Sequence, residues 1–371
     1  MPERPRLTPA IADVRRAVRG ALSSFSGDLG RISGDSSTGG RESGAVGSAS
    51  SGFSGETTLV LVALSGGPDS LALAAATAFE APRAGLRAGA VIVDHGLQSG
   101  SADVATRAAR QATELGLAPV RVERVQVGAD GGPEAAARTA RYAALERAAS
   151  ESHAAGVLLA HTLDDQAETV LLGLARGSGA ASLQGMPAER GIFRRPLLGI
   201  RRTTTVQACA DAGLEPWTDP QNADPAFARV RVRDTVLPLL EAQLGPGVAE
   251  ALVRTAEQLR EDTEALDSFA DELAEDLAEH AEAGISLDTR ALLANPPALR
   301  QRLIRLAVSS EFGVALSRQQ TLEVARLVTD WHGQDGVDLP GVRVVRRDGR
   351  LQFEARTVQN PGAARGTDGT E

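Results

Sequence analysis

The stretch LVLVALSGGPDSLALAAATAF, residues 59–79, decides the fold of this 371-residue chain. It opens with an unbroken apolar run, Leu59–Leu64. The run lacks the alternation of apolar and polar residues that marks a strand with one solvent-exposed face. Such a run predicts a strand buried on both faces of a parallel sheet. A glycine-rich turn and an Ala/Leu-rich helical segment follow. Strand, tight turn and helix start together predict an anion cradle, because glycines let the backbone approach a ligand and the helix dipole adds positive potential.

The polar residues of the turn suit a nucleotide. Ser65 and Ser70 supply hydroxyl donors, whereas Asp69 would repel a phosphate directly and is better suited to hold Mg²⁺ against phosphates. The alternative is a plain helix start, with Asp69 or Ser70 as its cap. All 39 Lys+Arg residues are arginine, so the chain cannot carry a P-loop lysine, a kinase lysine or a pyridoxal Schiff base. A nucleotide bound here must be held by backbone amides, hydroxyls, arginine and metal.

Length and composition leave room for two domains. The net charge of −9 and pI of about 5.3 argue against a bulk cationic nucleic-acid binder, but they are compatible with local arginine clusters. A single cysteine, Cys209, cannot form an internal disulfide or a cysteine-based metal or iron–sulfur site. No apolar run approaches the ~18 residues of a membrane span, and no signal-peptide core is visible at the start. We therefore expect a soluble, cytoplasmic protein.

A strand–helix alternation begins at Glu56 and predicts a parallel α/β sheet. The further strands are expected at 88–93, 120–127 and 157–160, and the helices between them at 101–115 and 134–150. Ser65, Asp94 and His161 lie at the carboxyl ends of strands, where open α/β sheets bind ligands. Before this region we expect an amphipathic helix at 7–22 and a flexible Ser/Gly-rich insertion at 23–55.

The segment HTLDDQAET, residues 161–169, passes from strand to helix. Asp165 and Glu168 are three residues apart and therefore share a helix face. They could stabilise the helix N-terminus through its dipole. With His161 they could form a metal site. They could also form a carboxylate pair that receives a substrate ammonium group.

Arginines are dense further along the chain, at Arg194 and Arg195 and again in the segment Phe227–Arg233. In the second segment Arg229, Arg231 and Arg233 are spaced by two, which is typical of a wet strand face but also suits a phosphate or RNA clamp. Beyond Gly247 leucines recur every seven residues and predict a long amphipathic helix. Helices at 297–308 and 317–330, a hairpin at 338–354 and a disordered tail after Gln359 complete the chain.

Several motifs in order resemble those of the tRNA(Ile)-lysidine synthase family, within the PP-loop ATP-pyrophosphatase superfamily. They are VALSGGPDS, VDHGLQSGS, EAAARTARY, AHTLDDQAETVLLGLARGSG, GMP with RRPLL, WTDPQN and the Arg-x-Arg-x-Arg run before LP. The resemblance implies an α/β, PP-loop parallel-sheet domain followed by a mainly helical C-terminal domain. The implied division is 1–55 for the N-terminal helix and insertion, 56–240 for the catalytic domain, 241–358 for a tRNA-binding domain and 359–371 for the tail. Compact members lack the 23–55 insertion.

The family uses ATP, Mg²⁺ and free L-lysine to convert the wobble cytidine of a tRNA(Ile) with a CAU anticodon to lysidine. The resemblance implies that Asp165 and Glu168 bind and deprotonate the lysine, and that Arg141 and Arg231 neutralise developing phosphate charge. Val230 departs from the family's usual asparagine. The implied ATP-binding residues are Ser65, Gly66, Gly67, Pro68, Asp69, Ser70, Asp94 and His161, with Asp69 also the metal ligand. The implied tRNA contacts are Arg194, Arg195, Arg229 and Arg233.

Three other classes remain open from the residues alone. A 2-thiocytidine-type PP-loop enzyme generally needs paired cysteines, which the one cysteine of this chain cannot supply. An amide-forming PP-loop ligase normally carries a glutamine-hydrolysing domain with a nucleophilic cysteine, and the sequence shows no such domain. A non-catalytic nucleotide-binding module would not require Asp165 and Glu168. The oligomeric state is left open, with a homodimer as one option.

Overall fold

The computed structural model of the chain describes residues 7–31, 57–96, 100–126, 128, 132–177, 179–219, 224–281 and 284–356. The chain clusters into two compact units, which divide between Glu257 and Gln258. This division lies inside one long helix, α10 (Val248–Leu277). The sequence-based boundary at 240/241 lies before that helix. The predicted tail after Gln359 lies outside the described residues.

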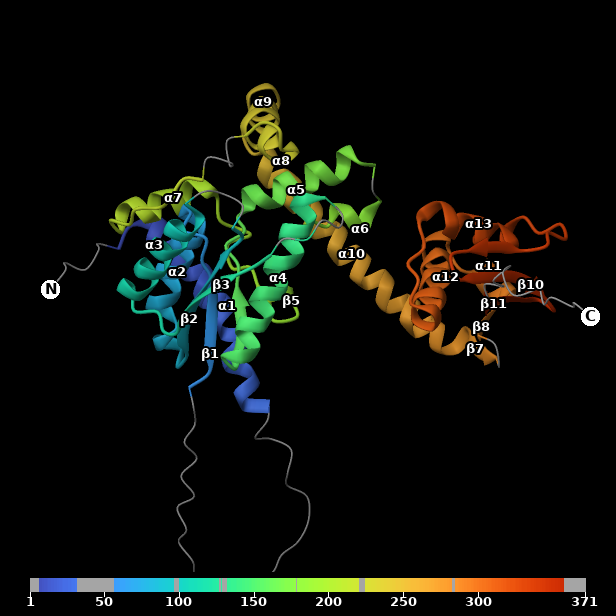
Figure 1. Ribbon diagram of the computed structural model, residues 1–371. Helices are drawn as coiled ribbons and strands as arrows, with labels where there is room; N and C mark the ends of the chain where they lie inside the picture. The colour runs from blue at the N-terminus through green and yellow to red at the C-terminus, as the bar shows by residue number, and fades with distance from the viewer. Residues whose placement is uncertain are drawn as a thin grey trace, which may run out of the picture. The chain divides into compact units, whose positions relative to one another are not determined.

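A six-stranded sheet with the order β3-β2-β1-β4-β6-β5 forms the centre of the first unit (Figure 1). Its strands are β1 (Leu59–Ala63), β2 (Arg87–Asp94), β3 (Val120–Arg124), β4 (Ala154–Leu158), β5 (Glu189–Arg190) and β6 (Phe193–Arg194). β1 pairs in parallel with β2 on one side and with β4 on the other, and β5 pairs antiparallel with β6. The chain thus turns to opposite sides of β1, so the carboxyl ends of β1 and β4 border a topological switch point. The predicted parallel sheet is confirmed.

Strand β1 is buried along its whole length, as its apolar run predicts. Its alternate residues join two different cores: Val60 and Val62 belong to one, Leu59 and Leu61 to the other. The helices packed in the first core are α1 (Pro9–Arg31), α2 (Pro68–Glu80), α3 (Ser101–Glu114) and α7 (Arg202–Asp211), and α4 (Pro133–Glu151) lies in the second. Figure 1 shows α2 and α3 on one side of the strands and α4 on the other. Each fully buried Leu or Val contributes about 1.5–3 kcal/mol of transfer free energy.

Helix α1 extends further than the sequence predicts. The amphipathic pattern predicts a helix over 7–22, but α1 continues to Arg31, so the first part of the expected insertion is helical. Phe25, which the prediction assigned to the insertion, is buried in the first core together with Val18 and Leu22. Burial of this one aromatic side chain explains the extension. Residues 32–55 of the expected insertion lie outside the described residues.

A helical layer covers the carboxyl end of the sheet. Its elements are α5 (Leu163–Ala175), α6 (Ala180–Leu183), α8 (Ala228–Arg231), a π-helical turn η3 (Val232–Val236) and α9 (Leu237–Leu244). Leu163 and Ala167 of α5 pack in one buried cluster with Val232 and Leu237. This packing fixes the arginine-bearing turn against α5. The three arginines therefore lie on helical and not extended backbone.

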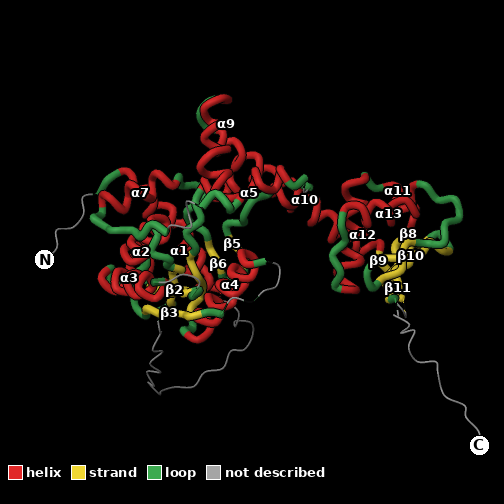
Figure 2. The backbone as a smooth tube through the Cα atoms, turned by 45° about the horizontal axis from the view of Figure 1, so that its top comes forward, coloured by secondary structure: helices red, strands yellow, loops and turns green. Residues whose placement is uncertain are grey.

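The second unit is an antiparallel sheet with helices packed against it (Figure 2). Its strands, in the order β7-β8-β11-β10-β9, are β7 (Ala278–Ala281), β8 (Gly284–Asp288), β9 (Val337–Leu339), β10 (Val342–Arg347) and β11 (Arg350–Ala355). Its helices are α11 (Thr289–Ala294), α12 (Pro297–Phe312) and α13 (Arg318–Thr329), together with the end of α10. The predicted hairpin is confirmed, and Asp348 and Gly349 at its tip both have positive φ, as a two-residue hairpin turn requires. The strands β7, β8 and β9 are not predicted by the sequence.

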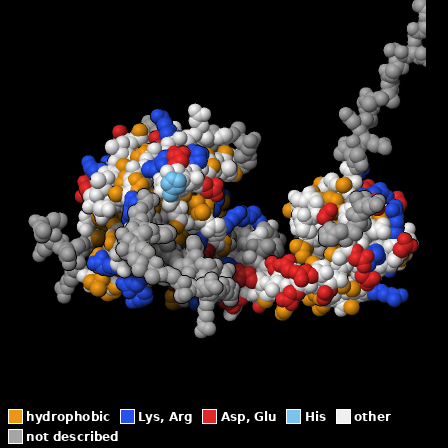
Figure 3. Space-filling view, turned by 90° about the horizontal axis from the view of Figure 1, so that it is seen from below, with side chains coloured by type: hydrophobic (Ala, Val, Ile, Leu, Met, Phe, Trp, Pro, Cys, Tyr) orange, Lys and Arg blue, Asp and Glu red, His pale blue; other side chains and the backbone are white. Residues whose placement is uncertain are grey.

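Helix α10 carries an acidic outer face. Exposed Asp and Glu side chains follow one another along it, and Figure 3 shows them as a run of red atoms. Among the described residues, no single helix has the length and apolarity of a membrane span, and one bent pair, Ala228–Leu244 with Val248–Leu277, meets both criteria jointly.

Candidate active site

The turn after β1 forms the expected cradle at the start of α2. Gly67 is the N-cap, Pro68 opens the helix, and Gly66 has a φ of +84° that favours glycine. The first intrahelical bond runs from the Leu71 N–H to the Gly67 carbonyl, so the N–H groups of the first turn remain for another acceptor. The Ser65 and Ser70 hydroxyls lie 3.1 Å apart, and the Ser70 hydroxyl donates to the Gly67 carbonyl. Amides and hydroxyls thus converge at a helix N-terminus, which suits a phosphate.

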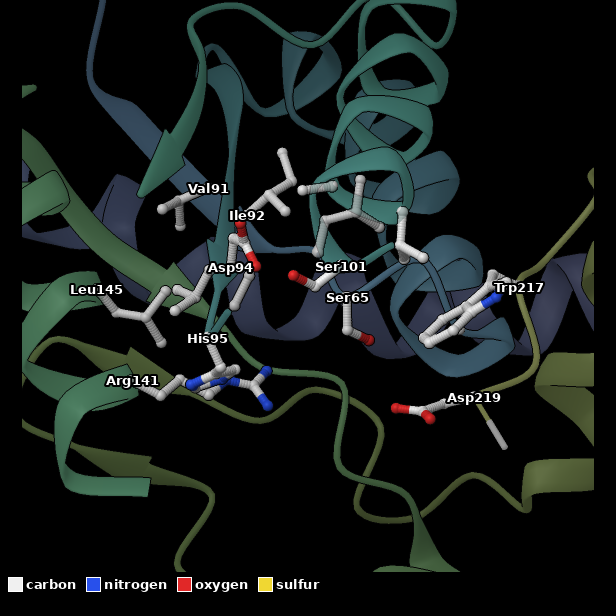
Figure 4. Close-up of a pocket in the computed structure, with 16 residues that line it drawn as sticks. Ser65, Val91, Ile92, Asp94, His95, Ser101, Arg141, Leu145, Trp217 and Asp219 are labelled. Carbon is white, nitrogen blue, oxygen red and sulfur yellow. The ribbon is translucent and has the colours of Figure 1, made fainter. Parts of the chain in front are cut away.

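A cavity of about 350 Å³ opens above this turn (Figure 4). Its walls come from the ends of β1 and β2, from α3 and α4, and from the loop that carries Trp217 and Asp219. The polar lining residues are Ser65, Asp94, His95, Ser101, Arg141 and Asp219, with Gly67 at the base. A volume of this size is typical of a small-molecule site at the switch point of an α/β sheet.

Asp94, at the end of β2, and Arg141, on α4, are two of the charged side chains that line this cavity. Asp94 accepts a hydrogen bond from the Gly96 N–H, and hydrogen bonds from Ser101 and Gly96 hold its pKa below the usual value. Arg141 lies beside His95 in Figure 4, and burial lowers the pKa of its guanidinium. Among the described residues, no hydrogen-bond acceptor and no carboxylate pairs with the Arg141 guanidinium. A buried guanidinium in that state favours an anionic ligand.

Asp165 and Glu168 lie together on the first turns of α5, as their spacing predicts. Asp165 forms a capping box with Thr162, whose N–H and hydroxyl both donate to Asp165 Oδ2 at 2.8 Å. Asp165 therefore stabilises the start of α5, which is one of the roles predicted from the sequence. Its second oxygen, Oδ1, accepts a hydrogen bond from Arg202 at 2.8 Å. Burial alone would raise the pKa of Asp165, but Arg202 and the Thr162 bonds outweigh it and leave the pKa below the usual value.

Glu168 is fully buried and is bound by three arginines. Arg233 binds it in bidentate fashion, with Nε–Oε1 2.8 Å and Nη2–Oε2 3.1 Å. Arg202 Nη1 lies 3.2 Å from Oε1, and Arg229 Nε lies 3.5 Å from Oε2. A buried carboxylate needs such compensation to stay charged. Glu168 is thus a buried acidic side chain held by three arginines.

Arg202 connects this carboxylate pair to the cradle. Its Nε lies 3.5 Å from Asp69 Oδ2, while its other nitrogens bind Asp165 and Glu168. The Thr205 hydroxyl, one turn further along α7, donates to Asp69 Oδ1. Burial would lower the pKa of Arg202, but the carboxylates, led by Asp165, raise it above the ordinary value. One arginine therefore contacts Asp69, Asp165 and Glu168, three of the four acidic residues that the sequence singles out.

This arrangement of a glycine cradle and a buried carboxylate pair can be compared with known proteins. A family model described as "PP-loop domain" matches residues 50–240, and one described as "TilS substrate binding domain" matches residues 287–352. The chain is 66% identical over 300 residues to the tRNA(Ile)-lysidine synthase of Leifsonia xyli subsp. xyli, which covers 81% of this chain and 90% of that relative. The chain belongs to the tRNA(Ile)-lysidine synthase family.

Further relatives agree with this family. The tRNA(Ile)-lysidine synthase of Thermobifida fusca is 55% identical over 80% of this chain and 92% of its own length. That of Streptomyces coelicolor is 54% identical over 78% of this chain and 83% of its own length. The resemblance that the motifs carry is confirmed.

Not every residue predicted for the lysidine synthase site lies in it. The guanidinium of Arg231 points away, because it donates to the carbonyls of Pro225 and Ala226 at 2.6 and 2.8 Å. Arg233 and Arg229 contact Glu168 instead, since the helical turn places them on the face toward α5. The choice of Arg231 as the site arginine does not fit this geometry.

The predicted tRNA contacts Arg194 and Arg195 are also engaged within the protein. Arg195 is buried and donates to the Pro187 carbonyl and the Tyr142 hydroxyl. Arg194 pairs with Glu189 at 3.2 Å and donates to the Gly191 carbonyl. The burial of Arg195 contradicts its prediction as a phosphate contact. Because Arg194 is paired within the protein, its contacts indicate a structural role.

The metal-site interpretation of His161, Asp165 and Glu168 is not supported. Among the described residues, no group of three or more His, Cys, Asp or Glu side chains is arranged to hold a metal ion. The three arginines around Glu168 explain this, because they already occupy its oxygens. His161 instead lines a smaller cavity beside Arg141.

Sequence reasoning missed Arg202, Thr205, Ser101 and Asp219. Arg202 belongs to an arginine-rich stretch that resembles a solvated face, and no spacing distinguishes it from Arg201. One signal was available: in a chain without lysine, a buried carboxylate pair requires an arginine or histidine partner. That signal gives the residue type but not its position.

Proposed function

We propose that this protein ligates free L-lysine to C2 of the wobble cytidine in a tRNA(Ile) with a CAU anticodon, using ATP. The observation that carries the proposal is the pairing of the cradle at Gly66–Ser70 with the buried carboxylates Asp165 and Glu168, joined by Arg202. Family membership supplies the reaction class. The products are lysidine, AMP and pyrophosphate.

In the first step the cytosine O2 attacks the α-phosphorus of ATP, and the bond to the β-phosphate oxygen breaks. Negative charge grows on the departing pyrophosphate, and the Gly66 and Gly67 turn provides amide donors for it. Arg141, which faces the same cavity, is suited to neutralise charge on the transferred phosphoryl group. The cytidine C2 is then activated by an attached AMP.

In the second step the ε-amine of lysine attacks C2, and AMP leaves. A lysine side chain arrives as an ammonium ion and must lose a proton before it can attack. Asp165 and Glu168 are carboxylates near the cradle, and the depressed pKa of Asp165 keeps it charged at neutral pH. We assign them to bind the ammonium group and to receive its proton.

The residues present suit Mg²⁺. Magnesium in proteins is commonly held by one or two carboxylates together with substrate phosphates. Asp69 at the first turn of α2 and Asp94 in the cavity wall are carboxylates at this end of the sheet. Bound Mg²⁺ would neutralise phosphate charge. Thr205 and Arg202 contact Asp69 and orient its carboxylate.

We propose that residues 287–352, which match the substrate-binding family model, make most of the tRNA contacts. We also propose that Arg229 and Arg233 contact the tRNA near its anticodon, because both lie beside Glu168. A tRNA substrate also favours the cytoplasm as the place of action.

Mass spectrometry of nucleosides tests this proposal. The protein is incubated with ATP, Mg²⁺, lysine and a CAU-anticodon tRNA, and the digest is searched for a lysine adduct of cytidine, with AMP and pyrophosphate as co-products. Glu168→Gln should abolish adduct formation. An unmodified cytidine, or release of ADP and orthophosphate, would overturn the assignment.

A further inference from the structure

A third cavity, of about 300 Å³, lies among helices α1, α2 and α7, which pack against one another. Ile11 and Val14 of α1, Phe79 of α2 and Leu115 after α3 form part of its wall. The rest of the wall that α2 and α7 contribute is alanine, and side chains of that size leave space between packed helices. Among the described residues, none that lines the ATP-sized cavity also lines this one. The proposed reaction therefore does not account for it.

Two arginines border this apolar space. Arg15 and Arg83 are the charged residues of its lining, and the other described residues that line it are all apolar. Each guanidinium carbon lies 3.5 Å from the centroid of the Phe79 ring, so both side chains stack on this aromatic. Arg83 also donates to the Phe79 carbonyl. Among the described residues, neither arginine forms an ion pair with a carboxylate. The cavity thus combines two cationic groups with an apolar interior.

The buried carboxylate of this region, Glu80, is bound by a different arginine. Arg19 donates to both of its oxygens, at 2.9 and 3.1 Å. Burial lowers the pKa of Arg15, and repulsion from Arg83 and Arg19 acts in the same direction, against the attraction of Glu80. Three arginines therefore share one carboxylate. The excess positive charge favours an anion beside Arg15 and Arg83.

The lining decides which anions fit. Away from the two arginines, the described residues offer no hydrogen-bonding side chain, so a sugar, a base or a polyphosphate would lose its hydrogen bonds to water there. An aliphatic chain loses none and is stabilised by burial of its surface. Ala72 and Phe79 both line the cavity, and the stretch of α2 between them spans about 10 Å. The space therefore suits a chain of medium length that ends in one anionic group.

We propose that this cavity binds a linear aliphatic carboxylate of medium chain length. Arg15 and Arg83 bind its carboxylate through charge-assisted hydrogen bonds, and its chain lies against the alanines of α2 and α7. The inference goes beyond the proposed function and does not depend on it. The ligand would nevertheless contact both helices that hold the acidic end of the cradle, because α2 carries Asp69 and α7 carries its partner Arg202.

Isothermal titration calorimetry with the full-length protein tests the site, with octanoate as the probe. Arg15→Met and Arg83→Met each remove one positive charge and keep an unbranched side chain. Ala75→Leu fills the cavity without changing a charge. Arg16→Met is the matched control, because Arg16 is exposed on the same helix as Arg15, pairs with Asp13 and does not line the cavity. Circular dichroism checks that each variant is folded.

Octanoate should bind the wild type in one-to-one stoichiometry with a Kd below about 1 mM. Arg15→Met, Arg83→Met and Ala75→Leu should each raise this Kd about fivefold or more, whereas Arg16→Met should leave it within about twofold. Hexanoate, which is shorter by two CH₂ groups, should bind about tenfold more weakly than octanoate. Octanol has the same chain without the charge and should also bind about fivefold more weakly or worse.

The absence of saturable octanoate binding to the wild type would overturn the inference. Equal losses of affinity in Arg15→Met and Arg16→Met would also overturn it, because the effect would then be one of general surface charge. The same holds if octanol binds as tightly as octanoate, or if inorganic phosphate displaces octanoate with comparable affinity. In the first case the cavity would not select an anion, and in the second it would not select the chain.

Discussion

The bidentate pair between Glu168 and Arg233 makes a quantitative prediction about stability. Glu168 is fully buried, and the Arg233 side chain keeps a quarter of its exposure. Exposed ion pairs contribute about 0.2–1 kcal/mol, whereas removal of one partner of a fully buried pair costs about 3–5 kcal/mol. Glu168 retains Arg202 and Arg229 when Arg233 is removed, so the cost lies between these limits. We expect Glu168→Gln and Arg233→Met each to lower the free energy of unfolding by about 2–3 kcal/mol.

A double-mutant cycle measures the pair itself. The double variant should lose about 3 kcal/mol and not the sum of the two single losses, which gives a coupling energy of about 2 kcal/mol. Urea unfolding followed by circular dichroism reports these values, and thermal unfolding should show each single variant roughly 5–10 °C below the wild type.

Arg231→Met is the matched control, because Arg231 lies in the same segment but donates to the carbonyls of Pro225 and Ala226. Its effect should add to that of Glu168→Gln within about 0.5 kcal/mol. A coupling energy below about 0.5 kcal/mol for Arg233, or an equal coupling for Arg231, would refute the assignment of Arg233 as the principal partner of Glu168.

Three further outcomes follow from the cradle, the carboxylate pair and the cysteine. Gly66→Ala should cost about 1–2 kcal/mol in unfolding experiments and weaken ATP binding in calorimetry, because φ is +84° there, whereas Gly67→Ala, with φ −73°, should leave stability nearly unchanged. Asp165 has a pKa below its unfolded value of about 3.9, so the stability it contributes is complete above that pH and lost as pH falls through the lower folded value. Asp165→Asn should therefore flatten the acid side of the stability curve in urea titrations at successive pH values. Burial raises the pKa of Cys209 to about 12, so a thiol reagent at pH 8 should label the unfolded protein at least tenfold faster than the native one, and equal rates would contradict the burial.

The parts of the fold that follow from local chemistry could be predicted from the sequence. Leu59–Leu64 has the composition of a doubly buried strand, and the glycine turn after it has few alternative conformations, so strand, cradle and helix appear as expected. The same holds for Asp165 and Glu168, whose spacing of three places them on one helix face.

The identity of the arginine partners could not be predicted in the same way. A spacing of two makes Arg229, Arg231 and Arg233 equivalent on a strand. On the helical backbone of α8 and η3 they point in different directions, and that backbone packs through Val232 and Leu237 against α5. Likewise, the extra turns of α1 depend on a buried site for Phe25 that the rest of the fold provides. Long-range packing decides these features, and sequence patterns carry little information about it.

Arg202 gives the site a property that neither motif has alone. Asp69 belongs to the cradle and Asp165 and Glu168 belong to α5, yet one guanidinium on α7 contacts all three. A cation arriving at the carboxylate pair competes with this guanidinium for the same oxygens, and any shift of Arg202 also changes the surroundings of Asp69. Because Arg233 and Arg229 hold Glu168 independently, the pair can exchange one cationic partner without becoming an uncompensated buried charge. If the proposed function holds, this arrangement links lysine binding at Asp165 and Glu168 to the surroundings of Asp69 through a single side chain.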